Sequence, residues 1–156
     1  MYVDNRSLLV KDVMSFPVIT ATADESIKKI ALKMKSNRIS SVVVVDKGNV
    51  PIGIVTQGDI VERLIAKTRN LLFAKAKNVM STPVITIKGD VTLENAANTM
   101  AKNRIKKLCV VDDNGKLVGI ITEGDIVKNA SSLIDVLREM INTGYAQRNE
   151  EEAAMR

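Results

Sequence analysis

The chain has 156 residues, of which 46% are hydrophobic and 26% charged, so it can bury a core and is not a disordered tail. Aromatic residues make up only 3%, and the net charge of +5 contains no long basic block, which argues against base-stacking platforms and nucleic-acid arms. The absence of histidine excludes Ser-His and Cys-His nucleophile pairs and His-ligated metal sites.

The single cysteine and the hydropathy pattern predict a soluble protein without an intrachain disulfide. Cys109 cannot form an intrachain disulfide, and its position in an apolar run predicts a small buried hydrophobic side chain. No stretch approaches the ~18 apolar residues of a membrane span, and the start of the chain lacks the apolar region of a signal peptide. We therefore expect a cytoplasmic protein without membrane contact.

An internal repeat organises the chain. A shift of 66 residues aligns VMSFPVIT with VMSTPVIT and GIVTQGDIV with GIITEGDIV, without a gap, and 24 of the 57 paired residues are identical. One copy is too small to bury a good core alone, so we expect the two copies to stack on each other. The predicted organisation is repeat 1 at 8–66, a basic connector at 67–75, repeat 2 at 76–132, and a C-terminal helix with a polar tail at 133–156.

The same elements are predicted in order in each copy. A short β-rich run, Val18-Ile19-Thr20, is followed by Asp24 as the expected N-cap of an amphipathic helix with apolar residues at 27, 30, 31 and 34. Asp90 takes the same place in the second copy. The Val-rich runs 41–46 and 108–112 predict strands buried on both faces.

A Gly/Asn turn then leads into a second strand, at 52–56 or 117–122, which predicts a hairpin. A second helix is expected to start near Gln57 or Glu123. The order β-α-β-β-α, repeated twice, predicts an α/β (α+β) fold.

The C-terminal region continues a helical apolar stripe up to Gly144, formed by Leu133, Val136, Leu137, Met140 and Ile141. Because this stripe lies beyond the second copy of the repeat, neither core requires it. It therefore predicts packing against a second protomer or against the flank of the domain. Membrane binding is disfavoured because the polar side of the stripe carries Asp135 and Glu139. We expect a homodimer.

Nothing in the sequence indicates an enzyme. The duplicated acidic residues fall at predicted caps and turns, where local hydrogen bonding explains them: Asp24 and Asp90, Asp46 and Asp112, Asp59 and Asp125. No Walker loop or GxGxxG run is present. No metal site is predicted.

The repeated segments Gly53–Asp59 and Gly119–Asp125 are the candidate binding motifs, each at a strand-to-helix junction. One interpretation is a plain helix start, with Thr as N-cap and Asp as its capping-box partner. However, Gly58 and Gly124 are poor helix formers in a first turn, which favours a molecule that approaches the backbone closely. A helix N-terminus suits phosphate, and a carboxylate can accept two hydrogen bonds from the vicinal hydroxyls of a ribose.

These motifs resemble the cystathionine-β-synthase (CBS) domain family. The resemblance rests on the repeat order, the Pro-Val-Ile-Thr lead, the Asn-Arg-Ile before a Val-Val-Asp strand, and the Gly-h-h-Thr-x-x-Asp signature, where h is aliphatic. It covers about residues 8–132, and two tandem copies resemble a Bateman module. It implies two repeats packed with pseudo-two-fold symmetry. It also implies a nucleotide-binding, energy-sensing regulator for AMP, ADP, ATP or S-adenosylmethionine, with no required cofactor.

Carried over residue by residue, the resemblance implies that Asp59 and Asp125 hold ribose hydroxyls and that Thr56 and Thr122 meet phosphate. Two backbone segments would border the adenine, Thr20-Ala21-Thr22 and Thr86-Ile87-Lys88. Two further segments would line the rest of each cleft, Ile39-Ser40-Ser41 and Ile105-Lys106-Lys107. Arg38 and Arg104 are either phosphate ligands or solvated helix ends.

The sequence departs from the family pattern in one place and from its own symmetry in another. The Leu-Pro pair that often precedes the Val-Val-Asp strand is replaced by Val42-Val43 and Leu108-Cys109, which leaves the cleft shape open. Lys106 and Lys107 replace Ser40 and Ser41, so the second cleft is expected to prefer the more anionic ligand.

Three hypotheses follow for the function. The first is a stand-alone sensor that dimerises and passes its ligand state to an unknown protein partner. The second is a ligand-free dimerisation scaffold, against which the intact Thr and Asp of both copies count. The third is a weak nucleic-acid-associated protein, suggested by a pI near 9.4 and by the basic connector.

Overall fold

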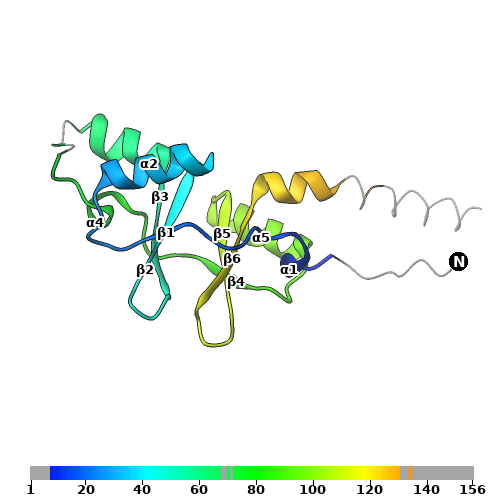
Figure 1. The fold of residues 1–156 in the computed structure, drawn as a ribbon. Coiled ribbons are helices and arrows are strands. Elements are labelled where there is room, and N and C mark those ends of the chain that lie inside the picture. Colours follow the sequence, from blue (N-terminus) through cyan, green and yellow to red (C-terminus); the bar gives the residue numbers. More distant parts are fainter. Residues whose placement is uncertain (1–7, 68–69, 71, 131–133, 135–156) are drawn as a thin grey trace, which may run out of the picture.

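The computed structural model describes residues 8–67, 70, 72–130 and 134, which form two small sheets with helices beside them (Figure 1). The elements of the first half are α1 (Val10–Val13), β1 (Thr20–Ala21), α2 (Ile27–Asn37), β2 (Ser41–Val45), β3 (Pro51–Thr56), α3 (Gln57–Asp59) and the π-helix η1 (Ile60–Ile65). Those of the second half are α4 (Ala76–Val79), β4 (Thr86–Lys88), α5 (Leu93–Asn103), β5 (Lys107–Val111) and β6 (Leu117–Thr122), followed by helical residues 123–130. The predicted mixed fold is confirmed, and the short helices α1 and α4 are added to it.

The two sheets have the same topology. Their strand orders are β1-β2-β3 and β4-β5-β6, with the first pair of strands parallel and the hairpin antiparallel in each. Figure 1 shows both hairpins, β2–β3 and β5–β6, pointing the same way. The central strands are buried along most of their length, as the Val-rich runs predicted. The predicted hairpins and buried strands are therefore confirmed.

The start of the first long helix differs from the prediction. Ser26 is the N-cap of α2 and accepts a hydrogen bond from the Lys29 backbone N at 3.2 Å. Asp24, two residues before it, accepts from Lys77 Nζ at 2.7 Å instead, and the Lys77 ammonium group lowers the pKa of that carboxyl. Thr92 likewise replaces Asp90 as the N-cap of α5. The predicted Asp caps are wrong because a cap must directly precede the first helical residue to reach the N3 amide.

The segments that lead into the two sheets cross from one repeat to the other. We call residues 10–19 and 76–85 the lead-in segments. Val10 is fully buried in the core of the second repeat, and Ala76 and Val79 are fully buried in that of the first. Figure 1 shows the first lead-in running from α1, near α5, to β1, and the second running from α4 to β4. Each repeat is thus completed by a segment of the other.

A third apolar cluster joins the two sheets. It is built around the buried residues Val43, Cys109 and Leu117, and Val18, Ile54 and Ile120 are among the side chains that pack against it. Cys109 is 1% exposed, and burial raises the pKa of its thiol to about 12. The predicted burial of Cys109 is confirmed, and its position identifies the contact on which the repeats stack.

Two remaining expectations concern the ends of the chain and the membrane. The predicted helix at 133–144 lies outside the described residues, apart from Ile134, which is helical and 48% exposed. Among the described residues, no helix is both long and apolar enough to cross a membrane.

Candidate functional site

A cleft of about 1480 Å³ lies between the two repeats, and both copies of the repeated motif open into it. Thr56 and Asp59 line it from the end of β3 and from α3, and Thr122 and Asp125 line it from the end of β6 and from the helix that follows. Two motifs 66 residues apart in sequence therefore contribute to one cavity.

Most of the residues expected at the site line this cleft. Twelve of them do: Arg38, Ile39, Ser40, Ser41, Thr56, Asp59, Arg104, Ile105, Lys106, Lys107, Thr122 and Asp125. Six do not: Thr20, Ala21, Thr22, Thr86, Ile87 and Lys88.

The six residues outside the cleft belong to strands β1 and β4 or directly follow β1. Ala21 and Ile87 are buried in the two cores, and Lys88 Nζ donates to the Asp112 backbone O at 2.7 Å. The chain lines the cleft just before these strands, at Val18-Ile19 and Val84-Ile85. The backbone that borders the cavity thus lies about two residues earlier than expected.

Several cleft residues were not anticipated from the sequence. They include two serines in the lead-in segments and the residues around each helix start: Ser15, Ser81, Gln57, Glu62, Glu123 and Lys128. Ser15 and Ser81 fall within the repeated Val-Met-Ser-x-Pro-Val-Ile-Thr motif, so their identity in both copies was a usable signal. Gln57, Glu62, Glu123 and Lys128 differ between the copies, which gave no such signal.

Each strand-to-helix junction forms a capping box. Thr56 N donates to Asp59 Oδ2 at 2.9 Å, and Asp59 N donates to Thr56 Oγ1 at 3.1 Å. The second copy has the same pair, at 2.9 Å from Thr122 N and 3.2 Å from Asp125 N. The plain helix start is therefore present in both copies. It engages only Oδ2 of each carboxylate and leaves lone pairs on both that can accept from a ligand, although Oδ1 of Asp59 also accepts from Ser81 Oγ.

The glycines of the motif separate into two kinds. An added Cβ at Gly58 or Gly124 would meet no protein atom closer than 3.6 Å, the Oγ1 of the preceding threonine. An added Cβ at Gly53 would instead lie 2.9 Å from Met80 Cγ. Gly53 is required by packing, whereas Gly58 and Gly124 line the cleft and leave space above the helix start. That space suits close approach of a bound molecule.

Two arginines reach the cleft from the ends of the long helices. Arg38 and Arg104 are the C-caps of α2 and α5, with left-handed φ angles of 52° and 54°. This conformation is uncommon for a residue with a side chain and costs about 1–2 kcal/mol. Neither guanidinium has a hydrogen-bond or ion-pair partner among the described residues, so both can receive an anion. Each arginine can therefore end its helix and also offer its guanidinium to a phosphate in the cleft.

The cleft is not symmetric in charge. Lys107 Nζ donates to Ser40 Oγ of the other repeat at 2.7 Å, so this ammonium group lies where the repeats meet. Burial lowers the pKa of Lys107, and the nearby Asp125 carboxylate opposes that shift. Lys106 and Lys128 add two further cations in the second repeat, where the first repeat has Ser40 and Glu62. An anionic group is therefore favoured on the side of the second repeat.

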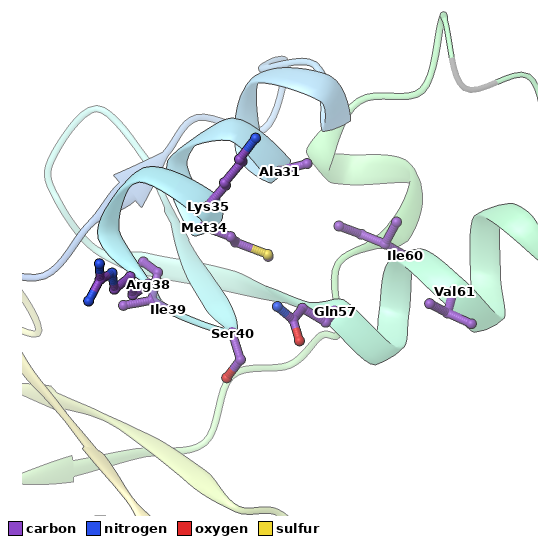
Figure 2. A pocket seen from close by; sticks show the side chains of 9 residues that line it. All are labelled: Ala31, Met34, Lys35, Arg38, Ile39, Ser40, Gln57, Ile60 and Val61. Carbon is purple, nitrogen blue, oxygen red and sulfur yellow. The ribbon is translucent and has the colours of Figure 1, made fainter.

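A smaller pocket of about 720 Å³ lies in the first repeat between α2 and the start of the next helical segment. Figure 2 shows Met34 from α2 and Ile60 from η1 pointing toward one another across it. The pocket shares Arg38, Ile39, Ser40 and Gln57 with the cleft, and its other walls are mostly apolar. It contains no part of the Thr-x-Gly-Asp motif beyond Gln57, so it is not the primary candidate site.

The donor set of the cleft is that of an organic anion or polyol site. No cluster of three or more Asp, Glu, His or Cys residues able to hold a metal ion occurs in the part of the chain that the structure describes.

Comparison with known proteins agrees with this arrangement. A family model for the CBS domain matches residues 10–66 and again 76–132. The uncharacterized protein MK0525 of Methanopyrus kandleri is 38% identical over 134 residues, which cover 86% of this chain and 68% of that protein. The CBS domain-containing protein YhcV of Bacillus subtilis is 35% identical over 123 residues, covering 79% of this chain and 86% of YhcV.

A solved structure shares both the fold and part of the sequence. It is the crystal structure of the CBS domain pair of protein MJ0100 in complex with 5'-methylthioadenosine and S-adenosyl-L-methionine. That pair is 31% identical to this chain, with a TM-score of 0.74, and the match covers 81% of this chain and 98% of that one.

Proposed function

The chain belongs to the CBS domain family as a tandem pair, and on this premise we propose that it is a regulatory module that binds an adenosine-containing ligand between its repeats. The observation that carries the proposal is the convergence of both Thr-x-Gly-Asp motifs on one cleft, each with a carboxylate oxygen beyond those used by the capping box. The MJ0100 pair, which binds 5'-methylthioadenosine and S-adenosyl-L-methionine, supports the ligand class.

In the proposed complex the two ends of the ligand meet different surfaces. The ribose hydroxyls donate to Asp59 or Asp125, and the adenine lies along the partly buried apolar side chains of Val18-Ile19 or Val84-Ile85. Phosphate groups contact the backbone N–H groups at the helix start and the guanidinium groups of Arg38 and Arg104. AMP, ADP, ATP and S-adenosylmethionine all contain the adenosine that such a site recognises.

Thermal unfolding with each of these compounds tests the proposal. A ligand at 100 times its dissociation constant stabilises the folded state by about 2.7 kcal/mol, which is roughly 5–10 °C for a chain of this size. Asp59→Asn and Asp125→Asn keep a side-chain acceptor for the capping box but remove the charge. We expect each to weaken binding about 10-fold at its own position, measured by calorimetry.

The matched control is Asp113→Asn, which changes an exposed carboxylate that is not among the residues lining the cleft. It is expected to leave affinity unchanged. If no adenosine compound shifts the melting temperature of the unmodified chain, the sensor function is wrong and the ligand-free scaffold is favoured.

We further propose that the module forms a homodimer in the cytoplasm, passes its ligand state to a protein partner and catalyses no reaction itself. Support for a second copy comes from exposed apolar side chains on α2 and η1, where Leu32, Val61 and Ile65 are 53–54% exposed. Sedimentation velocity should show a dimer for the unmodified chain and a monomer for Leu32→Lys with Val61→Glu. A dimer that persists in this variant would rule out α2 and η1 as the interface.

A further inference from the structure

The two carboxylates proposed to hold ribose hydroxyls have different surroundings. Asp59 Oδ1 accepts from Ser81 Oγ at 3.2 Å and lies 3.6 Å from Arg63 Nε. Asp125 is hydrogen-bonded only through Oδ2, to the backbone N and Oγ1 of Thr122, both at 2.9 Å. Within the described part of the chain, Oδ1 of Asp125 has no hydrogen-bond or ion-pair partner. The first carboxylate is thus occupied at the oxygen that the second leaves open.

Arg63 is held in place by contacts to the other repeat. Its NH1 group donates to the backbone O of Val79 at 3.2 Å and of Met80 at 3.0 Å. These carbonyls lie at the C-terminal end of α4, in the second lead-in segment. Arg63 therefore connects Asp59 to the segment that crosses between the repeats.

The residue of the second repeat that corresponds to Arg63 makes a different contact. The 66-residue shift pairs Arg63 with Asn129, whose Nδ2 donates to the backbone O of Asp125 at 2.7 Å. An asparagine side chain there contacts the helix backbone and leaves the carboxylate untouched. Arginine or asparagine at this paired position thus decides whether a guanidinium contacts the carboxylate.

The helices that carry these residues also differ. Arg63 lies in the π-helix η1, where Ala66 N bonds to Val61 O at 2.8 Å, whereas residues 123–130 are α-helical. π-Helical turns are rare and are often found at functional sites. The irregular turn in the first repeat coincides with the arginine that its copy lacks.

From these contacts we infer that the ion pair of Arg63 with Asp59, which we call the Arg63 latch, makes the ligand affinities of the two adenosine positions unequal. A vicinal diol at Asp59 competes for Oδ1 with the hydrogen bond from Ser81 and the ion pair with Arg63. A diol at Asp125 displaces neither, so the Asp125 position binds first and more tightly. This inference rests on the proposed function and assigns a specificity-determining residue within the same cleft.

Release of the latch also has a structural consequence. The Arg63 guanidinium contacts both Asp59 and the backbone carbonyls at the end of α4. When the ion pair with Asp59 breaks, only the contacts with α4 still hold the guanidinium. Binding at the Asp59 position is therefore coupled to the second lead-in segment, whereas binding at the Asp125 position is not. Differential contacts of this kind are what allow a ligand to shift a conformational equilibrium.

The test exchanges the two residues and uses 5'-methylthioadenosine, a diol without phosphate, so that attraction between phosphate and Arg63 does not interfere. Calorimetry of the unmodified chain should show two sites that differ at least 10-fold in affinity. Asp125→Asn should weaken the tighter site and Asp59→Asn the weaker one. Arg63→Asn should tighten the weaker site about 10-fold, and Asn129→Arg should weaken the tighter site by a similar factor.

Ser81→Ala provides a milder variant that leaves Arg63 and the α4 contacts in place, and it should tighten the weaker site about 3-fold. The latch is wrong if the ligand binds but the two sites are equal, or if neither Arg63→Asn nor Ser81→Ala changes the weaker one. Absence of binding to every variant and to the unmodified chain would instead overturn the proposed function, and the latch with it.

Discussion

Valine in place of Gly53 is expected to destabilise the protein by about 3 kcal/mol, at the upper end of what overpacking a closed core costs. A Cβ at this position would lie 2.9 Å from Met80 Cγ and 3.1 Å from Met80 Cβ and would overlap the sulfur. A change of Met80 rotamer can move the sulfur and Cγ but not the Cβ, so a tight contact remains in every rotamer. Thermal unfolding should show a decrease of roughly 6–12 °C in melting temperature.

A double-mutant cycle separates this clash from other effects of valine. In a Met80→Ala background the same change should cost less than half as much, because the Cγ and sulfur that overlap the added side chain are gone and only the Cβ remains. Gly58→Ala is the matched control. It lies in the same motif but has open space above it, so it should leave the melting temperature unchanged or raise it slightly. An equal loss in both backgrounds would show that Met80 is not the obstacle.

The importance of Gly53 follows from the crossing of the lead-in segments. Ser81 forms an antiparallel bridge with Ile54, and Ser15 forms the equivalent bridge with Ile120. The backbone of one repeat therefore runs directly against the hairpin of the other, and a side chain at Gly53 or Gly119 would block it. Since each core contains residues of both repeats, the two repeats should unfold together as one cooperative unit.

The periodicity of the sequence was sufficient to predict the two long helices and the hairpin strands, but not α1, α4 or the π-helical turns of η1. In α2 the buried residues are Ile27, Ile30 and Met34, which the helical spacing had placed on the inner face. The crossing of the lead-in segments could not be predicted, because a repeat aligned on itself does not say which copy a segment packs against. Val10 can complete either core by its hydrophobicity alone, and only the tertiary contacts decide.

For the site, the sequence identified the shared Thr and Asp residues and the exchange of Ser40 and Ser41 for Lys106 and Lys107, but it missed the shared serines and the role of Arg63. Thr56, Asp59 and their copies are repeated in the chain, and the structure brings them to one cleft. Arg63 and Asn129 occupy paired positions but differ in type, so comparison of the repeats gives no reason to select either. Contact between Arg63 and the α4 carbonyls joins residues 16 and 17 positions apart, which local patterns do not reveal.

Charge reversal at Lys106 and Lys107 is expected to reduce ATP affinity at least 100-fold. One charge-assisted hydrogen bond contributes about 1.5–3 kcal/mol, and two are lost here while two repulsive carboxylates are gained. Lys107 is half-buried and already carries a desolvation cost, which a phosphate beside it would offset. The measurement is calorimetric titration of the Lys106→Glu, Lys107→Glu variant with ATP.

S-Adenosylmethionine separates the effect of charge from damage to the cleft. It presents the same adenosine but a positive sulfonium in place of phosphate, so its affinity should stay the same or rise in this variant. Lys28→Glu with Lys102→Glu, two exposed lysines outside the cleft, makes the same change in net charge and should alter ATP affinity only slightly. If both double variants lower the ATP affinity equally, the net charge of the protein is responsible. The charge asymmetry of the cleft then does not select the ligand. If the Lys106→Glu, Lys107→Glu variant alone loses binding of both ATP and S-adenosylmethionine, the two lysines maintain the shape of the cleft. They then do not discriminate between ligands by charge.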